Sequence, residues 1–203
     1  PNLLHRTNRA KAESVLLKFE EELLAYDLPN ELTIVYSALK KIHLNTEKYY
    51  HYSSLYNKHI AYTLALDKAQ DLMVSFMLHL GEYHASGDEN IIRMFPPIRY
   101  ELDAVCHLYR SHHLMVYRNI MAVSMALFLH DKKLVTDDAP VEDMLVETEQ
   151  IILSYPLDSA YHYLKTVIYF LFFEYYHSLG QDKKEEQYFD LINSQLPYFL
   201  NFN

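Results

Sequence analysis

The chain has 203 residues, half of them hydrophobic, which is enough for one large domain or a short array of repeats. Three glycines exclude collagen-like chains and Gly-rich phosphate loops, and a single cysteine excludes an intramolecular disulfide and a multi-cysteine zinc site. The net charge of -9 argues against direct contact with nucleic acid, because such binding depends on clustered basic residues.

The apolar segments are short. The longest are 167–173 and, interrupted by Ser124, 120–129, whereas a bilayer span needs roughly 20 residues. Residues 1–6 lack the apolar core of a secretory signal. The sequence therefore predicts a cytoplasmic protein without membrane contact. Its first residue is not Met, which is consistent with a single helical-repeat domain over 1–203 taken from a longer chain.

Apolar residues recur every three or four positions along almost the whole chain, as in Leu32, Val35, Tyr36 and Leu39. This spacing places them on one face of a helix, and no useful stretch alternates with period two. The sequence predicts an all-α fold.

Turn residues divide this pattern. A first helix ends near Leu28, and Asn45 or Thr46 is a candidate N-cap for a helix that begins at Glu47. The breakers are Pro29, Gly87, Pro96, Pro97, Pro140, Pro156, Gly180 and Pro197, with a polar loop over 131–139. Gly87 and Gly180 suit the left-handed position that closes a helix. Further helices are expected over 32–42, 47–68, 71–86, 98–110, 114–129, 140–154, 157–179 and 181–196, with a short tail from Pro197.

Consecutive helices joined by short turns pack as antiparallel neighbours. The first helices of successive pairs would begin near Leu32, Asp71, Leu114 and Leu157. A repeat of about forty residues built from helix pairs is typical of an α-solenoid. The expected fold is thus an α-solenoid of about four antiparallel helix pairs plus a leading helix.

The last pair resembles a tetratricopeptide repeat, in residues spaced as that motif requires: Tyr169, Phe172, Tyr176, Gly180, Phe189 and Pro197. Phe173 and Glu185 stand where the motif has small residues, so this pair is expected to be splayed or repacked. A second copy is visible in the segment 78–83, which ends at Gly87.

Degenerate repeats of this kind are similar to the ligand-binding portion of bacterial peptide-sensing transcription regulators. In that family a helix-turn-helix domain precedes the repeats, and no such domain is visible in this chain. The resemblance implies a sensor portion that recognises a peptide or protein segment without catalysis. A scaffold module without a small ligand is the alternative within the same fold.

Signals for catalysis are weak, and we expect no enzyme and no cofactor. Glu174 and His177 lie on one helix face, but a di-iron helical-bundle oxidase needs two such motifs and further glutamates. Cys106 and His107 are adjacent on a helix and point about 100° apart, so activation of the thiol is not favoured. The oxidase remains a further alternative.

In tetratricopeptide-like arrays the first helix of each pair lines the concave side. Residues beside the core stripe of those helices form the candidate ligand site: Leu78, Glu82, Arg118, Asn119, Phe170, Glu174 and His177. Asn119 can donate to and accept from a peptide backbone, and Arg118 can hold a carboxylate. Glu82 and Glu174 give this groove an acidic side, which suits a ligand with some positive charge.

An array leaves apolar surface at its ends that needs caps or partners. The last expected helix exposes a charged side at 183–186, and the tail 198–202 is rich in aromatic residues. We therefore expect a homodimer formed by helices of the C-terminal third.

Overall fold

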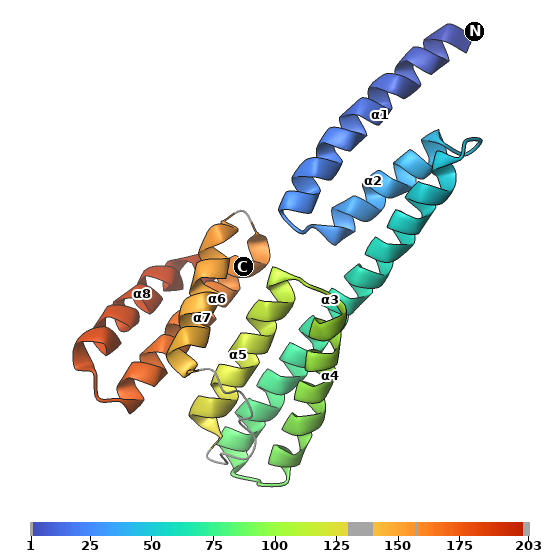
Figure 1. Cartoon of the computed structure of the whole chain (residues 1–203). Helices are drawn as coiled ribbons and strands as arrows, with labels where there is room; N and C mark the ends of the chain where they lie inside the picture. Colours follow the sequence, from blue (N-terminus) through green and yellow to red (C-terminus); the bar gives the residue numbers. More distant parts are fainter. Residues whose placement is uncertain (1, 130–139, 157, 201–203) are drawn as a thin grey trace. The chain divides into compact units, whose positions relative to one another are not determined.

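Eight α-helices and one 3-10 turn make up the computed structural model, which describes residues 2–129, 140–156 and 158–200 (Figure 1). These residues contain no β-strand, so the predicted all-α class is confirmed. No helix within them is both long and apolar enough to cross a bilayer. The elements are α1 (Asn2–Ala25), α2 (Pro29–Ile42), α3 (Lys48–Ser86), η1 (Ile91–Met94), α4 (Phe95–Leu108), α5 (His112–Phe128), α6 (Val141–Ser154), α7 (Ser159–Ser178) and α8 (Asp182–Leu200).

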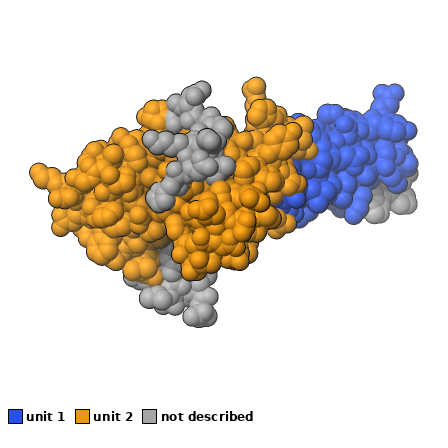
Figure 2. All heavy atoms as spheres, turned by 90° about the horizontal axis from the view of Figure 1, so that it is seen from below, with its two compact units in different colours: residues 1–69 blue, residues 70–203 orange. Residues whose placement is uncertain are grey.

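The chain divides into two compact units, residues 1–69 and residues 70–203 (Figure 2). Helix α3 contributes its residues 48–69 to the first unit and its residues 70–86 to the second. The sequence-based prediction that residues 1–203 form a single domain stays a prediction. The expected polar loop at 131–139 lies outside the described residues.

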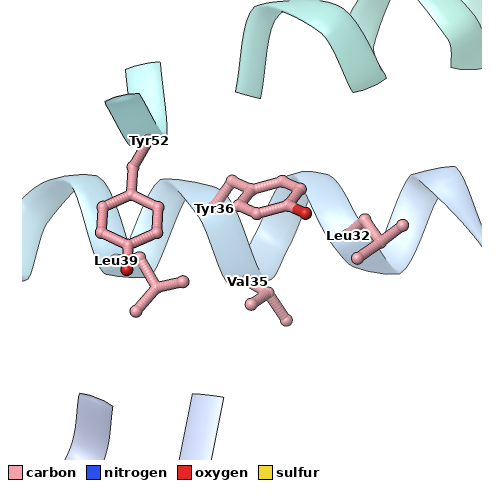
Figure 3. Close-up of a cluster of buried hydrophobic side chains, with 5 residues drawn as sticks. All are labelled: Leu32, Val35, Tyr36, Leu39 and Tyr52. Atoms are coloured by element: carbon pink, nitrogen blue, oxygen red, sulfur yellow. The ribbon is translucent and has the colours of Figure 1, made fainter. Parts of the chain in front are cut away.

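Unit 1 is held by an apolar face of α2. Leu32, Val35, Tyr36 and Leu39 are buried at the three- and four-residue spacing that the sequence indicated, and Tyr52 of α3 joins them (Figure 3). Each such side chain contributes about 1.5–3 kcal/mol relative to its exposed state. Leucines of α1 pack against this cluster, so one face of α2 organises all three helices of the unit.

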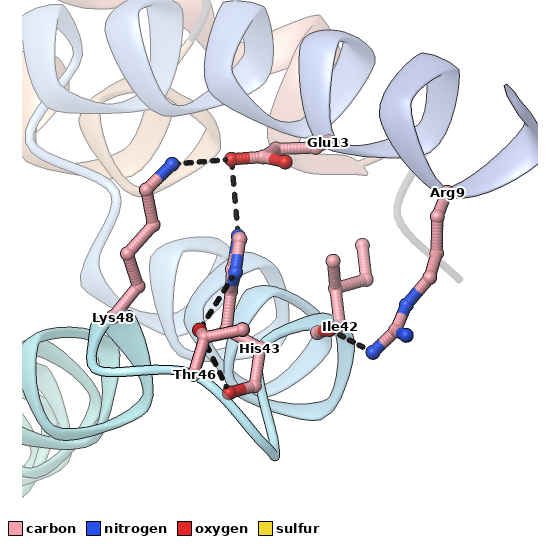
Figure 4. Close-up of polar contacts among 6 residues, drawn as sticks. All are labelled: Arg9, Glu13, Ile42, His43, Thr46 and Lys48. Carbon is pink, nitrogen blue, oxygen red and sulfur yellow. Dashed lines mark hydrogen bonds and ion pairs between the residues drawn. The ribbon is translucent and has the colours of Figure 1, made fainter. Parts of the chain in front are cut away.

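A polar cluster ties α1 to the connection between α2 and α3 (Figure 4). Lys48 Nζ donates to Glu13 Oε1 at 3.0 Å, and His43 Nε2 lies 3.0 Å from the same oxygen. Thr46 was a candidate N-cap, but its hydroxyl donates backwards to the carbonyl of His43 at 3.1 Å. The start of α3 is therefore held by Glu13 and Lys48 rather than by a threonine cap.

The boundary expected near residues 68–71 is wrong, because α3 continues without a break from Lys48 to Ser86. The segment from Asp67 to Asp71 contains neither Gly nor Pro, and Ala69 lies in it with the best helix propensity of any residue. Asp71 is an interior helix residue and not a cap. It therefore does not start a helix pair, and one marker of the forty-residue period is lost.

Three prolines that were expected to interrupt or follow a helix lie within one. Pro96 and Pro97 lie in the first turn of α4, which starts at Phe95 rather than at Ile98, because a missing amide hydrogen costs nothing there. Pro197 does not begin a tail, since α8 extends to Leu200. Near a helix end, few backbone hydrogen bonds depend on its missing donor.

Two glycines close helices as the sequence predicted, with left-handed φ values of 66° at Gly87 and 65° at Gly180. At Gly180 the amide donates to His177 O at 3.0 Å, and the next amide donates to Tyr176 O at 3.0 Å. This is the Schellman arrangement of a helix C-terminus. It reverses the chain within two residues, so that α8 packs back along α7.

Each helix of unit 2 from α4 onward packs against the next, and α5 also contacts α7. Between α7 and α8 the buried side chains of Phe172 and Tyr176 stack on Tyr188, whose ring lies 4.4 Å from that of Phe172. Phe189, which the tetratricopeptide spacing singled out, is 52% exposed. Tyr188 therefore makes the closer aromatic contact between these two helices, and Phe189 lies at a centroid distance of 6.2 Å from Phe173.

The left-handed turn at Gly180 gives a stability prediction with an internal control. Gly180→Ala adds a Cβ at φ 65° and is expected to lower the free energy of unfolding by about 1 kcal/mol. Gly81→Ala lies inside α3 with open space around its new Cβ and is expected to raise it by about 0.5–1 kcal/mol. Urea denaturation followed by circular dichroism compares the two, and a change of the same sign in both variants would contradict the prediction.

The Glu13 cluster gives an acid-dependence prediction. The hydrogen bond from Lys48 lowers the pKa of Glu13 below its ordinary value of 4.5, with a further contribution from His43 and an opposing one from burial. A carboxylate with a lowered pKa stabilises the fold above its unfolded pKa and loses this effect as the pH falls through the folded value.

Glu13→Gln should therefore flatten the loss of stability between about pH 5 and pH 3, an effect kept small by the exposure of Lys48. Thermal melts across this range test it, with Glu21→Gln on the exposed side of α1 as the matched control. An equal acid dependence in wild type and Glu13→Gln would show that the contact does not contribute.

Candidate functional site

A groove of about 1140 Å³ opens in unit 2 between the end of α4, the start of α5 and the second half of α6. Its apolar and aromatic lining consists of Tyr109, Leu114, Met115, Ile151 and Tyr155. Its charged and amide-bearing lining consists of Arg110, Arg118, Glu147 and Gln150, with Cys106, His107, Ser111, His112 and Ser154 completing the walls. Such a mixture can hold both the side chains and the polar backbone of an extended ligand.

One wall is the connection from α4 to α5, which contains neither Gly nor Pro. Tyr109 and Ser111 are extended, with φ and ψ of -130° and 127° and of -135° and 138°. Ser111 caps α5, because its hydroxyl accepts the amide hydrogen of His113 at 3.2 Å. Arg110 stands between these two residues and is exposed at the mouth of the groove.

Histidines at the start of α5 fix this wall to the connection between α6 and α7. The His112 ring stacks on Tyr155 with centroids 3.7 Å apart and an angle of 10°, and it also shares a hydrogen bond with the Tyr161 hydroxyl. His113 Nε2 lies 2.5 Å from Asp158 Oδ2, and both side chains are only 12% exposed. The position of the groove wall is therefore determined by aromatic stacking and by the polar contact between His113 and Asp158.

Arg118 enters the groove from α5 as part of a three-residue charge cluster. Its Nε donates to Asp103 Oδ1 at 2.9 Å, and Arg99 Nε lies 3.6 Å from the other oxygen of the same carboxylate. The Arg118 side chain is 43% exposed, whereas that of Arg99 is 11% exposed. A carboxylate anchored on α4 therefore holds Arg118 in a defined orientation.

Cys106 lies in the groove wall, but its thiol is not activated as a nucleophile. Burial, with a smaller contribution from the nearby Asp103 carboxylate, raises the pKa of its thiol to about 11. The thiol hydrogen points to the Leu114 carbonyl, with 3.6 Å between sulfur and oxygen. Because the thiolate is the nucleophile, a thiol that stays protonated at neutral pH does not supply one.

Asn119 lies behind the groove wall, 6% exposed, between α5 and α6. Its Nδ2 donates to Glu147 Oε2 at 3.0 Å and to Thr148 Oγ1 at 3.1 Å, and Thr148 in turn donates to the carbonyl of Met144. Buried polar groups require such partners, since leaving one unpaired costs about 1–3 kcal/mol. Asn119 thus bonds to the protein itself and reaches the groove only through Glu147.

The other expected ligand residues lie outside the groove lining. Leu78 and Glu82 are exposed on α3, and Phe170 of α7 is 43% exposed with its ring 6.1 Å from that of Phe128. Glu174 is half-buried, and His177 pairs with Glu185 of α8 at 3.1 Å. Of the expected set, the structure brings only Arg118 to the groove and Asn119 to its back wall.

Several groove residues were not anticipated from the sequence, above all Tyr109, Arg110, His112 and Tyr155. A signal for them exists in the run from Tyr109 to His113, where aromatic, basic and capping residues follow one another at a break between two helices. Binding residues concentrate on such connections. The groove is also less acidic than expected, because its lining carries two arginines and one glutamate.

The metal reading based on Glu174 and His177 finds no further ligands. Across 2–129, 140–156 and 158–200, no third His, Cys, Asp or Glu completes a compact ligand cluster with these two residues. His177 is instead engaged by Glu185 and stacks on Phe173, at a centroid distance of 6.1 Å.

Comparison with protein-family models, with curated proteins and with solved structures finds no match to this chain. The function is therefore argued from the geometry of the groove.

Proposed function

We propose that this chain recognises an extended peptide or protein segment without catalysis, as the cytoplasmic sensor portion of a transcription regulator. The observation that carries the proposal is the groove between α4, α5 and α6, whose volume of about 1140 Å³ exceeds the range of about 300–1000 Å³ common for small-molecule pockets. Its walls are held by the stack of His112 on Tyr155 and by the His113–Asp158 and Arg118–Asp103 contacts, so the groove is preorganised.

The repeat architecture that the proposal needs has support within unit 2. Successive helices pack against one another, and the contact between α5 and α7 joins the first helices of two neighbouring pairs. His84 of α3, Phe128 of α5 and Phe170 of α7 form a chain of ring contacts with centroids 5.6 and 6.1 Å apart. We propose that these helices form tetratricopeptide-like pairs arranged side by side.

The lining suits a peptide because it offers two kinds of contact. Leu114, Met115 and Ile151 give apolar surface for side chains, and Gln150 and Ser154 can donate to and accept from a ligand backbone. A scaffold that binds only a folded partner remains the alternative function, and the same groove would serve it. A metal analysis of the purified protein tests the oxidase alternative built on Glu174 and His177.

The peptide proposal is tested by truncating an apolar groove residue. Met115 is 42% exposed in the groove, and Met94 is 47% exposed in η1 away from its lining. Met115→Ala should weaken binding of fluorescein-labelled random octapeptides about fivefold, from the loss of roughly 1 kcal/mol of apolar contact, whereas Met94→Ala should not. Fluorescence polarisation measures both, and equal affinities for the two variants would contradict the site.

We also propose a homodimer through the C-terminal third. Phe189 and Leu196 lie seven residues apart, on one face of α8, and are 52% and 45% exposed. Two such residues on one helix face favour packing against another copy. Light scattering at high micromolar concentration should give about twice the chain mass, and Phe189→Asp should halve it. A monomeric wild type at that concentration would refute the dimer.

A further inference from the structure

We infer that the groove selects a peptide with an acidic side chain, whose carboxylate lies against Arg110 at the mouth, beside Arg118. The inference rests on the proposed function and adds the chemical class of the ligand. It reverses the sign expected from Glu82 and Glu174, which lie outside the groove lining.

The charge of the groove opposes that of the chain. The whole protein carries -9, yet the groove lining contains Arg110 and Arg118 against Glu147 alone. Glu147 already accepts a hydrogen bond from Asn119 in the contact between α5 and α6, at 3.0 Å. Positive side chains gathered in a cleft of an acidic protein create a local positive potential, which attracts negatively charged ligands.

Arg118 is held by a carboxylate of the protein. Asp103 is shared between Arg118 and Arg99. The contact with Asp103 also fixes the guanidinium plane through its Nε edge. A planar guanidinium held in one orientation loses less side-chain entropy when it binds a carboxylate.

Arg110 supplies the more accessible charge. It is exposed and forms no ion pair with another residue of the described chain. It stands one residue before Ser111, the cap of α5, and the first turn of α5 contains no acidic residue. The partial positive charge of this helix terminus adds to that of Arg110, while the Asp158 carboxylate contacts His113 in the same turn.

The occupant that fits is a peptide rather than a nucleic acid. Met115 and Ile151 lie in the same groove and provide apolar surface for the residues next to the acidic one. A polyphosphate backbone would extend beyond the groove over a chain with a net charge of -9, where it meets repulsion. A short acidic segment gains the local attraction without that cost.

Two pools of fluorescein-labelled octapeptides test the inference, random except for a central Glu in one and a central Gln in the other. The wild-type chain should bind the Glu pool about tenfold more tightly in low salt, and added salt should reduce the difference. Arg110→Gln should reduce the preference at least threefold, while Arg93→Gln, which removes an exposed arginine of η1 outside the groove lining, should retain it.

The outcomes separate the two proposals. Equal binding of both pools by the wild type overturns the acidic-ligand inference and leaves peptide recognition standing. Binding of neither pool overturns both. A preference that is the same in Arg110→Gln and in wild type also overturns the inference, because the carboxylate then binds elsewhere. Displacement of the Glu pool by a single-stranded oligonucleotide, but not by the unlabelled Glu pool, overturns it in favour of a nucleic acid.

Discussion

Both units depend on chain reversals in which one left-handed residue closes a helix so that the next can pack back along it. Asp27 has φ 51°, and the amide after it donates to Leu23 O, as in the turn at Gly180. A left-handed residue with a Cβ costs about 1 kcal/mol. The carboxylate of Asp27 offsets this cost by accepting the Tyr62 hydroxyl of α3 at 2.5 Å, so the first reversal is secured by the third helix of its unit.

The groove lies beside a connection that contains no left-handed residue. Between α4 and α5 the residues around Arg110 are extended, and none from Tyr109 to Ser111 has a positive φ. This connection is extended, unlike the left-handed turn at Gly180, and the groove opens beside it. The stack of His112 on Tyr155 then holds the wall against the end of α6.

Sequence periodicity was sufficient to predict the helices, but it did not identify the residues that line the groove. The buried face of α2 and the turn at Gly180 follow from local spacing and from the backbone freedom of glycine. The continuity of α3 differs from the prediction because Asp favours caps in general, whereas residues 67–71 contain neither Gly nor Pro to end a helix. Asn119 was placed in a groove because it is polar beside a core stripe, yet a partner on α6 draws it into the interior. Contacts between helices decide such cases, and the sequence of one helix does not contain them.

The net charge of the chain, like the pattern of one helix, does not determine the properties of the groove. The total of -9 is the argument against a nucleic-acid footprint, but a net charge describes the field far from the protein and not the field inside a cleft. The sharing of Asp103 between Arg99 and Arg118 depends on α4 and α5 lying side by side, because Asp103 and Arg118 are 15 positions apart in the sequence. The sign of the groove is thus a tertiary property. An acidic chain that gathers arginines at one concave surface repels anions over most of its surface and attracts them there, which favours short acidic ligands over long polyanions.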